Sequence, residues 1–429
     1  GARRKPARPA VWERVCRMRF YVVSRRRVLV CFAAILTCAS AAAAVLVEPV
    51  AGPPVVLDRE LVTRLNMIFS DRAESVIHGD AEALTTHYDL ESRYGRWALD
   101  REQRRIRYID TWSAARGVRF VGTAVELMVD SAEIKSDVAW LRLKQSADFA
   151  YVYDADPMAP PDHFGIGTRH FVELVRRDGT WLIRRDWYTD PLDEDSVVGT
   201  VRPALTPPGV PPAARIQGNG NSVNPPSTLV PAGTSASPGE PGSPSPSPTI
   251  WYNRDKAVAY ADEYCGSAWG CGNNRKYNPK YKDFTGLGGD CTNFVSQVLG
   301  DPEAGNLPMD WTWRYTFRGS GAGASRAWAQ AEALVAYLMN SGRARRIARG
   351  TYPDVVTPSA EFPYGAIGAL HPGDVIAYEE RGRIEHLAVV TGTDSHGYVV
   401  VNSHTADRYH VPWDLGWDRG TVFWLLKMF

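Results

Sequence analysis

The proline-rich stretch over residues 201–249 does most to constrain how this chain can fold. Thirteen of its 49 residues are proline, and Ser, Gly, Ala and Thr fill most of the remainder. Such a segment cannot bury enough apolar surface to hold a core, so we expect a disordered linker. A chain of 429 residues is long enough for two domains. The sequence therefore predicts two globular blocks, a first block over residues 57–198 and a second block over residues 251–429.

Residues 1–47 have the pattern of an export segment. Residues 1–27 hold ten Lys and Arg side chains against one acid, which leaves −8 for the rest of a chain whose formal net charge is +1. Residues 28–47 carry no charge, and a basic cytoplasmic flank before an apolar run directs the following residues out of the cytoplasm. Twenty apolar residues can also span a bilayer. A cleaved signal peptide and an uncleaved membrane anchor both stay open.

The charge balance bears on location and partners. We expect residues 57–429 to lie outside the cytoplasm, either secreted or anchored to the membrane through residues 28–47. The exported part has no basic surplus, so the sequence predicts no nucleic-acid partner.

The exported part contains an odd number of cysteines. Cys265 and Cys271 bracket a five-residue loop, and outside the cytoplasm we expect them to form a disulfide. Cys291 is then left over, and an odd exported thiol is a candidate reactive one. No Cys-x-x-Cys or His-Glu-x-x-His spacing occurs, so the sequence indicates neither a metal nor a cofactor.

The first block has an α+β order. Apolar residues recur at helical spacing from Leu61 to Val76 and again over residues 98–115. Predicted strands follow at residues 118–129, 138–145, 170–176 and 180–187, with a hairpin turn at Arg177-Asp178-Gly179. This order resembles the nuclear-transport-factor-2-like class in pattern only. Its scattered histidines favour a structural or binding role over catalysis; they are His78, His87, His163 and His170.

The second block contains the candidate chemistry. The run Gly288-Gly289-Asp290-Cys291 leads into an apolar pattern of helical spacing. Asp290 is an N-cap candidate, with a role as a partner of other site residues as the alternative. Cys291 would then lie in the first helical turn, where free N–H groups and the helix dipole favour a thiolate. Ninety-five residues later, His386 begins an apolar strand. Cysteine on a helix start followed by histidine on a strand is the chain order of papain-like cysteine hydrolases.

A third polar residue is expected on the next strand. The turn at residues 394–397 favours an antiparallel pair of strands, and residues two apart share a face. Asn402 or His404 would then reach His386 and orient its ring. Cys291 as nucleophile, His386 as base and His404 or Asn402 as orienter make a complete set.

Five stretches of the second block carry a family resemblance: residues 252–261, 290–297, 373–378, 386–392 and 403–405. With these motifs residues 251–429 resemble the bacterial amidase domain, a papain-like relative of NlpC-type and CHAP cell-wall hydrolases. The resemblance implies an α+β papain-like fold, an amidase or peptidase activity on peptide or cell-wall amides, and Cys291, His386 and His404 as catalytic residues. One departure is Glu385, where the family usually has aspartate.

The sequence thus predicts an exported cysteine amidase that works through a thioester, with N–H groups at the helix start as oxyanion donors. Two alternatives stay open. One is a cysteine acyltransferase that uses the same residues, and the other is a catalytically silent binding module that keeps the fold.

Overall fold

The computed structural model describes residues 57–189, 198, 200–205, 252–285, 287, 289–318, 323–417 and 420–429. The predicted N-terminal region (1–27), the export segment (28–47) and residues 206–249 of the predicted linker lie outside these residues. Within the described part, no helix is both long and apolar enough to cross a bilayer.

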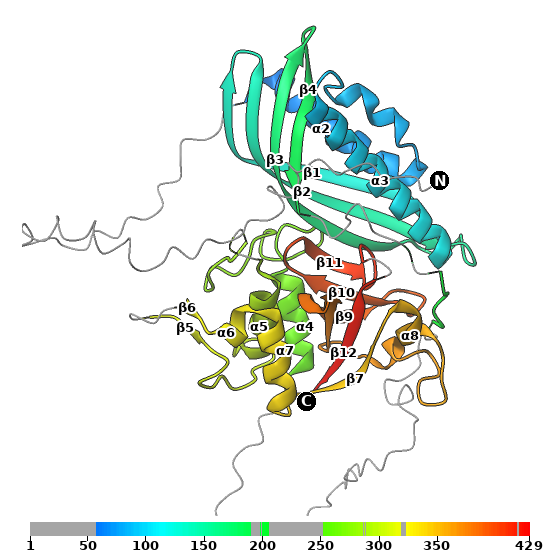
Figure 1. Cartoon of the computed structure of the whole chain (residues 1–429), viewed down its shortest axis with the longest axis vertical. Coiled ribbons are helices and arrows are strands. Elements are labelled where there is room, and N and C mark those ends of the chain that lie inside the picture. Colours follow the sequence, from blue (N-terminus) through cyan, green and yellow to red (C-terminus); the bar gives the residue numbers. More distant parts are fainter. Residues whose placement is uncertain are drawn as a thin grey trace, which may run out of the picture. The chain divides into compact units, whose positions relative to one another are not determined.

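The first block consists of helices packed on an antiparallel sheet, which confirms the predicted α+β order. Its elements are α2 (Arg59–His78), η1 (Glu82–His87), α3 (Arg93–Arg116), β1 (Val118–Lys135), β2 (Val138–Tyr153), β3 (Asp162–Arg177) and β4 (Thr180–Tyr188) (Figure 1). Asp58 caps α2 by accepting the N–H groups of Glu60 and Leu61. Asp178 and Gly179 both have positive φ, at 47° and 78°, as a tight hairpin turn requires.

The second block places helices on both faces of its strands. Its elements are α4 (Arg254–Glu263), α5 (Cys291–Gly300), β5 (Tyr315–Thr316), β6 (Gly323–Ala324), α6 (Arg326–Ala329), α7 (Ala331–Asn340), β7 (Ala344–Gly350), α8 (Tyr352–Val356), η3 (Ile367–Ala369), β8 (Val375–Glu380), β9 (Arg383–Thr393), β10 (Val399–Ser403), β11 (Asp407–Pro412) and β12 (Val422–Met428). Helices α4, α5 and α7 share a core with one face of β8, β9 and β12, and α8 packs on the other face. The helix expected around residues 327–341 is two helices, because Gln330 between them is extended.

One antiparallel sheet runs through both blocks, in the order β1-β2-β3-β11-β10-β9-β8-β12-β7, with β4 also paired to β3. Strand β4 covers only the later part of β3, so residues 165–167 of β3 are left to pair with β11. Val411 and Leu415 of the second block lie in the hydrophobic core of the first. The described residues of both blocks therefore belong to one compact unit.

Two glycines of β3 allow the Cys265–Cys271 loop to approach the strand. A Cβ at Gly165 would lie 1.8 Å from the carbonyl oxygen of Trp269, and one at Gly167 would lie 2.3 Å from Ser267 Oγ. Both contacts are too short for any side chain, so the loop sits against the bare backbone of β3.

Replacement of Gly165 with alanine is therefore expected to lower the free energy of unfolding by about 1–3 kcal/mol, because the new methyl group displaces the loop backbone. Gly122→Ala is a matched control in β1, since its Cβ would meet Ala150 Cβ at an ordinary 3.6 Å. Urea denaturation of both variants measures the difference. Equal stability of the two would contradict the close approach.

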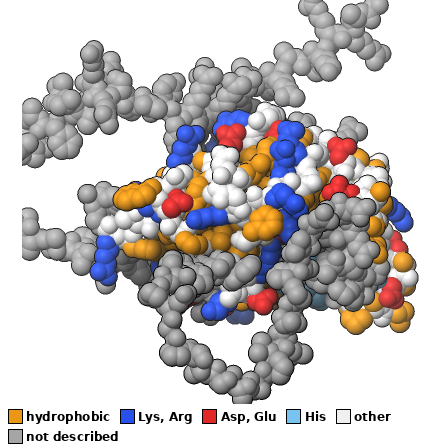
Figure 2. All heavy atoms as spheres, turned by 90° about the horizontal axis from the view of Figure 1, so that it is seen from below, with side chains coloured by type: hydrophobic (Ala, Val, Ile, Leu, Met, Phe, Trp, Pro, Cys, Tyr) orange, Lys and Arg blue, Asp and Glu red, His pale blue; other side chains and the backbone are white. Residues whose placement is uncertain are grey.

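The outer edge of the sheet is charged. Edge strand β7 exposes Arg345, Arg346 and Arg349. Charged side chains on an edge discourage pairing with another chain. Figure 2 shows one face of the molecule, on which Lys and Arg side chains gather in a band between hydrophobic ones.

Candidate active site

Cys291 is the first residue of α5, as the sequence predicts, but Asp290 does not cap the helix. Within the described structure the Asp290 side chain makes no capping bond to α5. Its Oδ2 instead lies 2.6 Å from His404 Nδ1, and its Oδ1 accepts the Asn293 Nδ2 and Phe284 N–H groups at 2.9 and 2.8 Å. The carboxylate thus ties the loop before the nucleophile to the end of β10, which is the alternative role considered for it.

The Cys291 sulfur lies against strand β9. The side chain is buried, and the backbone N–H groups of Leu387 and Thr292 point at the sulfur. Burial raises the pKa of the Cys291 thiol above its ordinary value, and the Asp290 charge adds to the rise. The Leu387 N–H opposes it, as do the hydroxyl and the N–H of Thr292. The structure thus differs from the expected lowered pKa, because desolvation outweighs the effect of the helix start.

His386 lies in β9 directly before Leu387, the residue whose N–H contacts the Cys291 sulfur. Its ring is 5.5 Å from the ring of Tyr378 and 5.2 Å from that of Trp417. Nε2 of His386 is buried and has no hydrogen-bond partner among the described residues. Burial, followed by the nearby charges of Arg408 and His404, lowers the pKa of His386 from 6.5 to about 3. The imidazole is therefore neutral at pH 7.

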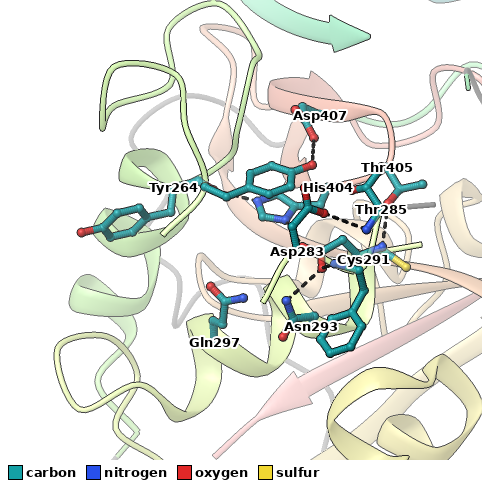
Figure 3. A network of polar contacts seen from close by, with 12 residues as sticks. Tyr264, Asp283, Thr285, Cys291, Asn293, Gln297, His404, Thr405 and Asp407 are labelled. Carbon is teal, nitrogen blue, oxygen red and sulfur yellow. Dashed lines mark hydrogen bonds and ion pairs between the residues drawn. The ribbon is translucent and has the colours of Figure 1, made fainter. Parts of the chain in front are cut away.

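His404 is held by four neighbours. Its Nδ1 bonds to Asp290, and its Nε2 is 2.7 Å from the carbonyl oxygen of Tyr264. The ring is stacked between Tyr277 and Phe294, at centroid distances of 3.8 and 4.2 Å. Figure 3 shows His404 in the middle of this polar network and the Cys291 sulfur at its edge. Both ring nitrogens are occupied, so His404 makes no hydrogen bond to His386 in the described structure.

Asn402 is likewise engaged elsewhere. Its Nδ2 donates to Asp262 Oδ1 at 2.8 Å and to the Ala261 carbonyl at 3.1 Å, and its Oδ1 accepts the His410 N–H at 2.7 Å. The described contacts include no bond from Asn402 to His386. The expected orienting bond to His386 is thus absent for both candidates.

The physical reason is that the β9–β10 pair is irregular. The expectation relied on strict alternation over residues 398–404, but β10 ends at Ser403. Strand β9 also carries one extra residue, Thr391, because Val400 pairs with Gly392 whereas Val401 pairs with Val390. One extra residue in a strand moves each later side chain to the other face.

The predicted disulfide between Cys265 and Cys271 is present. Its loop supports the network, because Ser267 donates through both N–H and Oγ to Asp407 Oδ2 at 2.7 Å. Asp407 also accepts the Tyr277 hydroxyl at 2.5 Å. No sequence motif marks Asp407 or Tyr277, because Tyr277 acts by stacking on the His404 ring and Asp407 by accepting the Tyr277 hydroxyl.

Of the histidines of the first block, His87 and His170 are buried, whereas His78 and His163 are exposed. His170 lies between Asp186 and Thr168, with its Nε2 2.8 Å from Thr168 Oγ1. The cavity beside Arg72 and Tyr188 has a volume of about 10 Å³, room for one water at most. Nowhere in the described ranges do three or more His, Cys, Asp or Glu side chains converge as metal ligands.

The raised pKa of Cys291 gives a testable pH profile. Only the thiolate reacts with iodoacetamide, so we expect slow alkylation at pH 7 and a rise beyond the value of an ordinary thiol, about pH 8.5. His386→Ala is expected to leave this profile unchanged, because His386 carries no charge there. Mass spectrometry of the peptide with Cys291 separates it from Cys16, Cys31 and Cys38. Fast labelling below pH 7 that His386→Ala slows would instead reveal a thiolate–imidazolium pair.

Several solved structures are similar to the N-terminal region. One titled as a putative scytalone dehydratase from Novosphingobium aromaticivorans is 15% identical, with a TM-score of 0.22, and the match covers 30% of this chain and 83% of that one. A putative NTF2-like transpeptidase from Campylobacter jejuni is 15% identical, covering 27% and 94%, at 0.16. A hexachlorocyclohexane dehydrochlorinase (LinA) is 14% identical, covering 35% and 97%, at 0.20.

The second block matches a family. No curated protein sequence matches the chain. Residues 251–426 match the model of the family described as "Putative amidase domain". This match covers the part of the chain that contains Cys291 and His386, and it supports a hydrolase-like amidase function for that part.

Proposed function

We propose that this chain is an exported cysteine amidase that hydrolyses peptide amides, with Cys291 as nucleophile and His386 as base. One observation carries the proposal. The Cys291 sulfur contacts the N–H of Leu387, and the adjacent His386 has a buried ring nitrogen without a partner in the described structure. A buried polar atom without a partner is costly, and a catalytic role is one explanation for keeping it. The match to an amidase domain fits this chemistry.

The charges favour a mechanism that begins from neutral groups. The Cys291 thiol attacks the amide carbonyl carbon while the neutral His386 takes its proton. The resulting oxyanion accepts hydrogen bonds from backbone N–H groups at the start of α5. The C–N bond then breaks, the amine leaves with the proton from His386, and a thioester remains on Cys291. Water, deprotonated by His386, hydrolyses the thioester to a carboxylate and restores the thiol.

In this proposal the rings of Tyr378 and Trp417 orient His386, a part first expected of His404 or Asn402. His404 serves as a positioning residue, since its bond to Asp290 fixes the loop that carries Cys291. Asn402 fixes the end of α4 through Ala261 and Asp262.

The proposal places residues 57–429 outside the cytoplasm, secreted or anchored to the membrane by residues 28–47. The Cys265–Cys271 disulfide supports this placement, because disulfides persist in oxidising compartments. The peptides of the cell wall are then the available amides, and we propose them as the substrate class.

The test is product analysis on the full chain with wall stem peptides and with fluorogenic peptide amides. We expect free amine and a carboxylate that has gained one oxygen from ¹⁸O-labelled water. A second reaction with an added amine separates the acyltransferase alternative, whose product would be the new amide. Absence of both products over the whole panel would favour the binding module and overturn the proposal.

A further inference from the structure

The loop from Trp413 to Trp417 leads from β11 to His386, the proposed general base. The Trp417 indole stacks on Tyr378 at 4.1 Å, with an interplanar angle of 21°, and its centroid is 5.2 Å from that of His386. The Tyr378 hydroxyl donates to the Trp413 carbonyl at 2.8 Å. Both ends of this loop therefore pack against the rings around His386.

The middle of the loop is fastened to the first block by a buried carboxylate, which we name the Asp414 clamp after Asp414, Trp112, Arg116 and Tyr398. Asp414 Oδ2 accepts Trp112 Nε1 at 3.0 Å and Arg116 Nε and Nη2 at 3.0 and 2.5 Å. Its Oδ1 accepts the Tyr398 hydroxyl at 2.7 Å. The side chains of Arg116 and Asp414 are each only 3% exposed. A buried carboxylate with this many donors is confined to one position.

A second contact fastens the residue next to the tryptophan. The Gly416 N–H donates to the Tyr108 hydroxyl at 3.0 Å in a buried position. Tyr108, Trp112 and Arg116 all belong to α3 and recur every four residues, so they lie on one face of that helix. One face of α3 thus holds the loop at Asp414 and at Gly416.

We propose that α3 of the first block is a working part of the amidase site, because it positions Trp417 against His386 through the Asp414 clamp and Tyr108. The tryptophan in turn orients the imidazole and covers the side of the ring that it contacts. This inference rests on the proposed function of His386. It makes Tyr108, Arg116 and Asp414 positioning residues.

The pKa of His386 reports the position of the loop, because charged and aromatic groups surround the ring. They come from β11, from the residue after β10, from β8 and from the loop, namely Arg408, His404, Tyr378 and Trp417. Arg408 is tied to the same loop, since its Nη1 donates to the Leu415 carbonyl at 2.7 Å. A loosened loop admits water to the ring, which weakens the desolvation that now lowers the pKa of His386 to about 3.

The experiment compares two deletions of a single hydroxyl in the full chain. Tyr108→Phe removes the contact to Gly416, whereas the matched Tyr153→Phe removes a contact between the blocks at Asp394, 2.6 Å long and outside the loop. The ring signals of the nine histidines are followed by NMR against pH, and His386→Gln identifies the relevant one. We expect Tyr108→Phe to raise the pKa of His386 by about one unit, a tenfold change in proton affinity. Tyr153→Phe is expected to leave it unchanged.

The Trp417→Ala variant tests whether Tyr108 acts on His386 through the indole. If Tyr108 acts through Trp417, Tyr108→Phe has no further effect on the His386 titration once the indole is gone. An undiminished effect in that background, or an equal shift with Tyr153→Phe, would overturn the proposal. The titration requires no substrate, so a chain that hydrolyses no amide can still confirm or refute the role of α3.

Discussion

Replacement of Cys291 with alanine is expected to reduce amide hydrolysis by about 10⁴-fold or more. Without the sulfur no thioester forms, and the remaining groups act only by binding and by stabilising the oxyanion. Because the side chain is buried at the start of α5, its removal also leaves a small cavity. The rate of amine release, measured at saturating substrate, reports the effect.

A control is needed to separate lost chemistry from lost packing. Val295→Ala lies in the same helix and is fully buried, so it opens a cavity while the sulfur is kept. We expect this variant to lose some stability but to keep most of its turnover. A Cys291→Ala protein that still hydrolyses amides at a similar rate would exclude Cys291 as nucleophile.

Replacement of Arg72 with methionine is expected to cost about 3–5 kcal/mol of stability, the typical cost of breaking a buried ion pair. Arg72 donates to Glu102 at 2.6 Å and to Asp186 at 2.7 Å, with all three side chains at most 4% exposed. His170 contacts Asp186 as well, at 3.0 Å. Without the guanidinium two carboxylates remain buried, and each loses the cation that contacts it at 2.6 or 2.7 Å.

The stability of the fold depends on pH through the carboxyl group of Asp186. Burial acts to raise the pKa of this carboxyl, but His170 and Arg72 outweigh it and hold the pKa below its ordinary range. The stability that this group contributes is present above the unfolded value of about 3.9 and is lost as the pH falls. Arg72→Met removes one of the two cations, so unfolding in acid is expected to begin at a higher pH.

Denaturation in urea at pH 7 and at about pH 3, below the unfolded value of about 3.9, measures both effects. Arg104→Met is the control, because Arg104 pairs with Asp100 on the surface of α3 with 30% and 52% of the side chains exposed. Such pairs contribute at most about 1 kcal/mol. Equal costs for the two variants would contradict the buried network.

The sequence predicts the local elements of the site well. The helix at Cys291, the strand at His386 and the turn at Asp178-Gly179 each depend on a pattern within a few neighbouring residues. The Cys265–Cys271 disulfide closes a loop so short that spacing alone suggests it. These features form because periodicity, turn chemistry and proximity along the chain act locally.

Contacts between distant residues could not be predicted in this way. Gly165 of β3 pairs with Tyr409 of β11 across the two blocks. No local sequence pattern predicts that the first part of β3 is left without β4 as its neighbour. The extra residue Thr391 in β9 reverses the cross-strand parity that pointed Asn402 and His404 at His386. A bulge is set by neighbouring strands, so alternation along one strand cannot reveal it.

The charge states at the site could not be predicted from the sequence either, because they depend on burial in the folded protein. A helix start favours a thiolate in water-accessible surroundings, but burial of the Cys291 sulfur outweighs the nearby N–H groups and raises the pKa of the thiol. The Asp414 clamp is a further case, since Arg116 and Asp414 are 298 residues apart in the chain.

The measurement that tests the central claim most directly is capture of the thioester. The full chain is mixed with wall stem peptides or peptide amides, quenched in acid within the first turnover and digested for mass spectrometry. The account predicts an acyl group on the peptide that contains Cys291, present in the wild type and absent in Cys291→Ala. Turnover without any acyl group on that peptide, or an acyl group on another residue that decays at the rate of turnover, would contradict it.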